Sequence, residues 1–254
     1  MRAGIPRPPQ GSPGARDRGS QELATGSCSP GAGTAVHTRH VAGCCDARGC
    51  DGVFGDRFAR RQARRYRKRG LGRTEQRVVD SLVARGVEGA TVLEIGGGVG
   101  ELQLELLRAG AAHATNLELV DAYDAHARAL AAEAGLDDRV ERRIHDVAAD
   151  PQGVAPADVV VLHRVVCCYP DVERLLAAAA DRTNRLLVFS HPPRNAATRV
   201  LAGLENAALA VRGKTYRAFA HRPALMLEVL ERHGLRVVEA HRGFAWHVVV
   251  LSRS

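Results

Sequence analysis

A glycine-rich turn joins an apolar strand to a helix near residue 95. The strand is predicted over Thr91–Ile95, the turn reads Gly96-Gly97-Gly98-Val99-Gly100, and the helix covers Gly100–Arg108. A turn of this kind brings backbone N–H groups close to a ligand at the N-terminus of the helix. The three segments therefore predict the first unit of an α/β fold, with a ligand site at the carboxyl end of its strand.

Strands and helices alternate from this turn onward, which predicts a parallel sheet with helices on both faces. The last two strands are joined by a tight turn at Arg242-Gly243 and must be antiparallel to each other. Further strands are predicted over His113–Leu119, Arg139–Ile144, Asp158–Leu162, Arg185–Ser190, Leu235–Ala240 and Phe244–Leu251, and further helices over Ala125–Ala134, Asp171–Asp181, Ala196–Val211 and Pro223–Arg232.

Composition divides the chain into three predicted parts. Residues 1–52 are rich in Gly, Pro, Ser and Arg, so they are expected to form a disordered tail, which carries a Cys/His cluster. Residues 53–88 are expected to form a basic helical cap, with one helix from Phe54 to Arg69 and a second over Arg73–Arg85. Residues 89–254 are expected to form the α/β domain.

The net charge of +8 arises in one short segment. Eight basic residues and no acidic one lie between Arg57 and Arg69, and the other basic residues equal the 28 acidic ones in number. This basic helix allows three interpretations: a solvated helix that caps the site, attraction of an anionic small substrate, or contact with nucleic acid. Aromatic residues make up only 4% of the chain, which disfavours a platform for stacking bases.

The sequence favours a cytoplasmic protein. No apolar run approaches the ~18 residues that span a bilayer, and the first residues lack the apolar stretch of a secretory signal. The adjacent pairs Cys44-Cys45 and Cys167-Cys168 do not resemble the spaced cysteines of a small disulfide-bonded domain, so reduced thiols are expected.

The glycine turn does not fit the common phosphate-binding motifs. A dinucleotide motif GxGxxG that starts at Gly96 requires glycine at position 101, where the chain has Glu101. A carboxylate there would repel a pyrophosphate, and the motif GxxxxGK[ST] is absent. Bound NAD, FAD and nucleoside triphosphates are therefore disfavoured.

Glu94, Gly96, Gly98 and Gly100 instead resemble motif I of the class I S-adenosylmethionine-dependent methyltransferases, an acid at the strand end followed by alternate glycines. The resemblance covers roughly residues 90–254, because the order of the later elements also agrees. It implies a Rossmann-like, doubly wound seven-stranded sheet, mostly parallel with an antiparallel C-terminal strand, and S-adenosylmethionine as methyl donor. The layout is distantly similar to the magnesium-protoporphyrin O-methyltransferases and other small-molecule branches.

The resemblance also implies residues that bind the donor. Glu118, at the end of the second strand, corresponds to the acid that accepts both ribose hydroxyls, with Asp121 as the second choice. Asp146 corresponds to the acceptor of the adenine amino group, with Val147 beside it, and Glu94 is expected near the methionine amino end. The alternative is that these are ordinary solvated acids at strand ends.

The methyl acceptor is expected beyond the fourth strand, where the resemblance places it. His163 is the first candidate for a general base or substrate contact and His191 the second, although a strand-end histidine can also serve only to bond backbone. Tyr66, Arg164 and Tyr169 are the predicted substrate contacts. The motif [ND]-Pro-Pro-[YFW] is absent from this place, so a small molecule methylated at oxygen, nitrogen or sulfur is favoured over a nucleobase amine.

Two other functions stay open from the sequence. The basic helix predicts, as one alternative, a methyltransferase that acts on RNA or another nucleic acid. His37, His40, Cys44, Cys45 and Cys50 lie close together in the chain and, with Cys167-Cys168, predict as a second alternative a protein that binds or methylates a metal or metalloid. No CxxC spacing supports a metal site, so no metal ligand is assigned.

Overall fold

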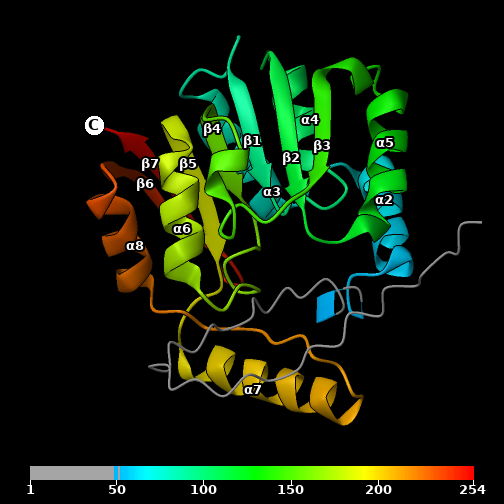
Figure 1. Ribbon diagram of the computed structural model, residues 1–254, viewed down its shortest axis with the longest axis vertical. Helices are drawn as coiled ribbons and strands as arrows, with labels where there is room; N and C mark the ends of the chain where they lie inside the picture. Colours follow the sequence, from blue (N-terminus) through cyan, green and yellow to red (C-terminus); the bar gives the residue numbers. More distant parts are fainter. Residues whose placement is uncertain (1–48, 51) are drawn as a thin grey trace, which may run out of the picture. The chain divides into compact units, whose positions relative to one another are not determined.

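The structure, a computed structural model, describes residues 49–50 and 52–254, and most of the predicted tail over residues 1–52 lies outside them. One seven-stranded sheet forms the centre, and β7 runs antiparallel to both of its neighbours, β5 and β6, while the other neighbouring strands pair in parallel (Figure 1). This confirms the predicted fold class. The strands, in order across the sheet, are β3 (Val140–Ile144), β2 (His113–Glu118), β1 (Thr91–Ile95), β4 (Ala157–Leu162), β5 (Thr183–His191), β7 (His247–Arg253) and β6 (Leu235–Arg242).

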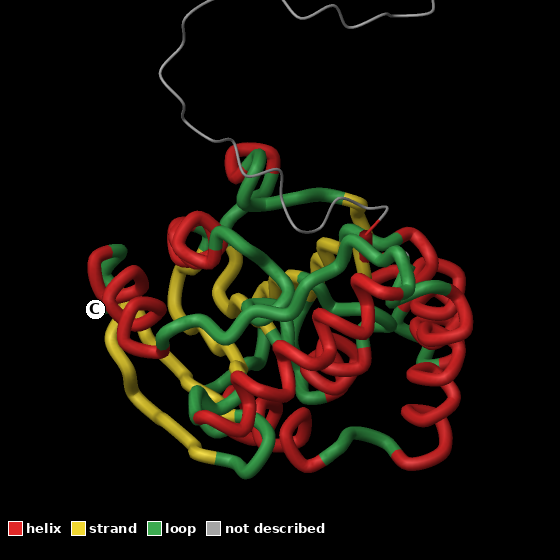
Figure 2. The backbone as a smooth tube through the Cα atoms, turned by 90° about the horizontal axis from the view of Figure 1, so that it is seen from below, coloured by secondary structure: helices red, strands yellow, loops and turns green. Residues whose placement is uncertain are grey.

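Helices cover both faces of the sheet (Figures 1 and 2). Side chains alternate along a buried strand, so Val159 and Val161 join the core on one face while Val160 joins the core on the other. The first core packs against α2 (Asp56–Arg69), α3 (Arg73–Val83), α4 (Glu101–Arg108) and α5 (Asp124–Glu133), and the second against α6 (Val172–Asp181) and α8 (Pro223–Arg232).

Several predicted boundaries shift by a few residues. β5 begins two residues earlier than predicted, and α3 ends at Val83 rather than Arg85. The last strand begins at His247 rather than Phe244, because the Gly243 N–H donates to the Trp246 carbonyl and closes a turn that leaves Phe244 fully exposed. None of these shifts alters the order of strands.

The cap helix α2 and the insert helix that follows β5 both lie outside the sheet, and they differ in packing. In α2, Ala59 and Ala63 are buried and fix the helix on the first core. The insert helix α7 (Ala196–Val211) has no buried residue, and Leu201 and Leu204 are largely exposed. No helix in the described part of the chain combines the length and apolarity needed to cross a membrane.

Candidate active site

A cavity of about 500 Å³ opens at the carboxyl ends of the central strands, within the range of small-molecule sites. Most of the predicted site residues, far apart in the sequence, line this one cavity. From the predicted donor set these are Glu94, Gly96, Gly98, Glu118, Asp146 and Val147, and from the predicted acceptor set His163, Arg164 and Tyr169.

The glycine turn packs too closely for side chains. Gly96 has φ +65°, and a Cβ atom there would stand 2.6 Å from Cγ2 of Val165. Gly100 adopts the left-handed conformation that begins α4 and lies behind the cavity wall, so its role is to shape the turn. Backbone at Gly96 and Gly98 therefore forms the floor of the cavity.

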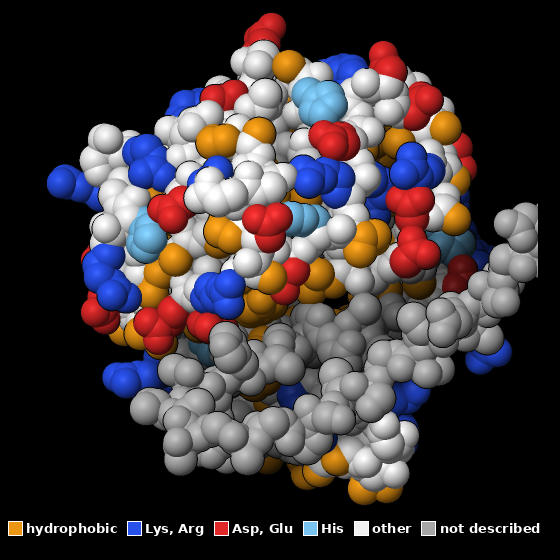
Figure 3. All heavy atoms as spheres, in the orientation of Figure 1, with side chains coloured by type: hydrophobic (Ala, Val, Ile, Leu, Met, Phe, Trp, Pro, Cys, Tyr) orange, Lys and Arg blue, Asp and Glu red, His pale blue; other side chains and the backbone are white. Residues whose placement is uncertain are grey.

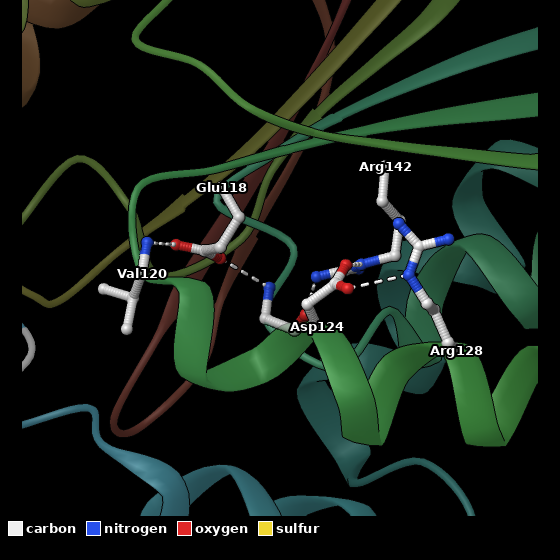
Figure 4. A network of polar contacts seen from close by, with 6 residues as sticks. Glu118, Val120, Asp124, Arg128 and Arg142 are labelled. Atoms are coloured by element: carbon white, nitrogen blue, oxygen red, sulfur yellow. Dashed lines mark hydrogen bonds and ion pairs between the residues drawn. The ribbon is translucent and has the colours of Figure 1, made fainter. Parts of the chain in front are cut away.

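Glu118 is held by backbone N–H groups at the end of β2 (Figure 4). Its carboxylate accepts from Gly98 and Leu119, both at 2.9 Å, and from Val120 at 3.3 Å. Burial raises the pKa of Glu118, and the backbone bonds act in the opposite direction by stabilising the charged form. Asp121 is exposed and lies outside the cavity, so geometry favours Glu118 over the second choice.

Arg142 of β3 supports the turn from behind. Its side chain is 4% exposed, donates to the Gly98 carbonyl at 3.0 Å, and contacts Asp124 at 3.3 Å. The same Asp124 carboxylate accepts from Arg128 (Figure 4). A positive charge fixed beneath the turn partly offsets the negative charge of the acids above it.

Asp146 lies at the end of the cavity beyond β3. It accepts from the Ala148 N–H at 3.0 Å and from the Tyr169 hydroxyl at 3.0 Å. The Tyr169 hydroxyl therefore contacts the predicted adenine acceptor, while Tyr169 also lines the cavity, and its role as a substrate contact stays a prediction. Buried Val147 lines the cavity next to Asp146.

Two carboxyl groups are buried side by side where β1 meets α4. Burial, reinforced by repulsion from Glu101, raises the pKa of Glu94 to about 8. Glu101 accepts from the Gln62 side chain at 2.7 Å, and burial raises its pKa too. One oxygen of each carboxyl group is buried without a hydrogen-bond partner among the residues described.

These oxygens show whether S-adenosylmethionine, the predicted methyl donor, fits the residues of the site. A buried carboxyl oxygen without a partner is costly, and a ligand with a positive charge and N–H donors would satisfy it. S-adenosylmethionine carries both an ammonium group and a sulfonium, so the residues present fit it. In the sequence, Glu101 served only as evidence against a dinucleotide. Its position one residue after the turn also indicates a role in the site.

His163 directly follows β4 and takes part in a polar network. Its Nδ1 lies 3.0 Å from the Ser190 hydroxyl oxygen, which also accepts from the Arg164 N–H at 2.9 Å. Its Nε2 lies 3.6 Å from a carboxylate oxygen of Glu75 in α3. The hydrogen bond at Nδ1 therefore orients the ring, while Nε2 is buried without a hydrogen-bond partner among the described residues, and His163 lines the cavity.

Arg164 carries backbone strain that its contacts stabilise. It has φ +60°, a conformation uncommon for residues with a Cβ atom and one that clusters at functional sites. Its guanidinium lies 2.9 Å from Glu75 and 5.1 Å above the Trp246 ring. Burial acts to raise the pKa of Glu75, but its contacts with His163 and Arg164 outweigh this and hold the pKa at about 2.

Two predicted residues lie away from the cavity. Tyr66 donates to Glu105 of α4 at 2.6 Å, which turns its hydroxyl from the site. His191 is 5% exposed and stacks on Phe189, with Nδ1 2.9 Å from the Pro192 carbonyl. Its neighbour Ser190 faces His163 instead, because adjacent strand residues point to opposite faces.

The cap residues cover the open side of the cavity. Phe58, Arg61, Gln62 and Arg65 line it from one face of α2 at helical spacing, and Phe54 lines it from the preceding turn. The Phe54 ring lies edge-on to Phe58 at 5.5 Å and to Tyr216 at 5.2 Å. The cap therefore contributes both aromatic rings and guanidinium groups to the cavity lining.

The cysteine hypothesis gains no support from the described residues. The Cys167 and Cys168 sulfurs lie 3.7 Å apart, and Cys168 contacts the Tyr216 hydroxyl at 3.0 Å. Within residues 49–50 and 52–254, no three His, Cys, Asp or Glu side chains are grouped to hold a metal ion. The remaining members of the predicted cluster, at positions 37–45, lie outside the described residues.

The distribution of charge on the surface is relevant to the alternative function, methylation of a nucleic acid. On the face shown in Figure 3, basic and acidic side chains are intermixed. Within the basic helix, Arg67 pairs with Glu133 at 2.7 Å, and Arg61 and Arg65 line the cavity. The basic residues of this helix therefore do not share one environment, since one forms an ion pair and two line the cavity.

Comparison with known proteins places this geometry in a family. Residues 58–240 match the family described as "Methyltransferase domain". Among curated proteins, no relative of the chain is found.

Solved structures share the fold. Magnesium protoporphyrin IX methyltransferase from Synechocystis PCC 6803, with bound SAH, aligns with a TM-score of 0.61 and 21% identity over 80% of this chain and 97% of that one. An O-methyltransferase family protein from Burkholderia thailandensis aligns with a TM-score of 0.62 and 20% identity over 82% and 64%. Mitomycin 7-O-methyltransferase aligns with a TM-score of 0.54 and 24% identity over 76% and 58%. The match covers most of the chain, and it agrees with the sheet order and the glycine turn: the protein belongs to the methyltransferase domain family, as a class I enzyme that uses S-adenosylmethionine.

Proposed function

We propose that this enzyme transfers the methyl group of S-adenosylmethionine to a small-molecule acceptor held between α2 and the end of β4. The observation that carries the proposal is one cavity, whose lining includes both Asp146 and Arg164 and, from the cap, Phe54 and Phe58. A covered cavity of this size suits a small molecule better than a polymer. The O-methyltransferases with the same fold support this acceptor class.

The donor would lie along the glycine turn. Glu118 would accept from the ribose hydroxyls, Asp146 with Val147 would hold the adenine, and Glu94 with Glu101 would face the methionine ammonium. The donor supplies an electrophilic methyl group on a sulfonium. The chain's own residues would hold the acceptor atom in line with it and exclude water.

His163 is the proposed general base. This role needs the tautomer in which Nδ1–H donates to Ser190, so that Nε2 can take a proton from the acceptor. Glu75, 3.6 Å away, would then stabilise the imidazolium and keep the ring oriented.

A binding comparison tests the proposal. We expect S-adenosylhomocysteine to raise the melting temperature of the protein and NAD to leave it unchanged, and the acceptor is then sought by screening small molecules for release of S-adenosylhomocysteine. Stabilisation by NAD alone would overturn the assignment. We also propose a cytoplasmic enzyme, on the ground that adjacent cysteines do not suit a disulfide framework.

A further inference from the structure

The arginines of the basic helix fall on two faces of α2. Arg61 and Arg65 share the cavity face with Phe58 and Gln62. Arg60 and Arg64 are also exposed but lie outside the cavity lining. If the arginines only interacted with solvent, none would need to line the cavity. The presence of two of them in the cavity lining therefore points to a ligand.

Positive charge exceeds negative charge at this end of the cavity. Arg65 and Arg164 share one carboxylate, Glu75, at 3.8 and 2.9 Å. Arg61 forms no ion pair with any residue that the structure describes. Two of the three guanidinium groups therefore share one carboxylate, and the third has no ion pair among the described residues.

The acids of the donor end do not neutralise this excess. Glu118 and Asp146 accept from backbone N–H groups or from Tyr169. Glu94 and Glu101 are buried with raised pKa values, so part of their charge is lost. No ion pair joins any of the four to the three arginines within the described range.

The Nε of Arg164 adds an independent observation. It is buried and has no hydrogen-bond partner among the described residues, although Arg164 lines the cavity. Guanidinium groups bind carboxylates through paired N–H donors, and a buried donor without a partner is costly. An anionic ligand group would satisfy it.

The same cavity also has apolar walls. The rings of Phe54 and Phe58 and the side chain of Val165 line it. From these contacts we infer that the methyl acceptor is an apolar, ring-containing molecule with an anionic group, most simply a carboxylate, held by Arg61, Arg65 and Arg164. This inference rests on the proposed function, because it names the acceptor class of the same site.

A pair of fluorescent probes tests the inference before any acceptor is known. Anilinonaphthalene sulfonate has apolar rings and one negative charge, and N-phenylnaphthylamine has the same rings without the charge. With S-adenosylhomocysteine at saturation, we expect the sulfonate to bind at least about tenfold more tightly than the neutral probe. Equal affinity for both would overturn the inference.

Two matched double variants locate the effect. R61Q/R65Q removes two charges from the cavity face, and R60Q/R64Q removes two from the same helix outside the cavity. We expect the first to weaken sulfonate binding about tenfold with little change for the neutral probe, and the second to change neither by more than about twofold. Equal losses in both would show only long-range attraction and contradict the inference.

S-adenosylhomocysteine binding separates this inference from the proposed function. If the wild type prefers the sulfonate as expected, with or without added S-adenosylhomocysteine, but calorimetry detects no binding of S-adenosylhomocysteine, the proposed function fails while the anion site stands. If R61Q/R65Q is not folded, R61Q alone replaces it, because Arg61 is exposed and unpaired among described residues. An unchanged sulfonate affinity in R61Q would then contradict the inference.

Discussion

The two ends of the cavity are built in different ways. At the donor end, the contacts come from strand ends and the turns that follow them: Glu118 accepts from Gly98, Leu119 and Val120, and Asp146 accepts from Ala148 and Tyr169. At the acceptor end, contacts join distant parts of the chain, since Arg164 of the β4 loop meets Glu75 of α3 and Trp246 of the last hairpin.

This difference explains why one fold can serve many acceptors. Contacts at the donor end depend on strand ends and a glycine turn, which the sheet itself positions. Contacts at the acceptor end depend on a cap helix and hairpin packed from elsewhere, and these can change without disturbing the sheet. Substitutions at the donor end should therefore cost more than those at the acceptor end.

The largest effect is expected for Gly96→Ala. The alanine would adopt a left-handed conformation and meet Val165 at 2.6 Å, so we expect a loss of about 3 kcal/mol in the free energy of unfolding, measured in urea. Gly135→Ala is the control, since Gly135 has φ +66° but open space around it. Equal losses in both variants would mean that contact with Val165 adds nothing.

Glu118→Ala should weaken S-adenosylhomocysteine binding by about 2 kcal/mol, or about 30-fold, because the lost carboxylate would accept two charge-assisted hydrogen bonds. Titration calorimetry measures the dissociation constant. Asp121→Ala serves as the control and should have almost no effect. A weaker dissociation constant in Asp121→Ala instead would transfer the ribose role to that residue.

The pKa of Glu94 predicts how stability depends on pH. Its folded pKa of about 8 exceeds the ordinary 4.5, so the folded state binds more protons between these values and stability falls as pH rises through that window. From about pH 6 to about pH 8 we expect the wild type to lose about 1–2 kcal/mol more than Glu94→Gln. Parallel profiles of unfolding free energy for the two proteins would refute the raised pKa.

The smallest effect is expected at the acceptor end. Trp246→Ala removes the ring beneath Arg164 and should weaken binding of anilinonaphthalene sulfonate about two- to fivefold, while S-adenosylhomocysteine affinity stays constant. Phe244→Ala, in the same turn but fully exposed, is the matched control. A greater loss for S-adenosylhomocysteine than for the sulfonate would contradict the division into two ends.

The residues that sequence analysis missed share one property. Glu75 reads as an ordinary acid in the first turn of a helix, and Ser190 as part of an apolar strand. Neither has a local signal, because each acts through a partner far along the chain. Tyr66, a predicted substrate contact, lies away from the cavity for a simpler reason. Arg65 is the last residue of α2 that lines the cavity, and the next residue, Tyr66, turns its hydroxyl to Glu105.

By itself, the sequence determined the order of strands and helices along the chain and the turn at Gly96, because periodicity and turn residues are local properties of a chain. The resemblance to a family then pointed to Glu94, Glu118 and Asp146, which do line the cavity. Only the tertiary structure decided which arginines reach the cavity and that Glu75 joins His163 to Arg164. Those contacts depend on how α2 and α3 pack over the sheet, which is set by burial of Ala59, Ala63 and Val78 against a core assembled from the whole chain.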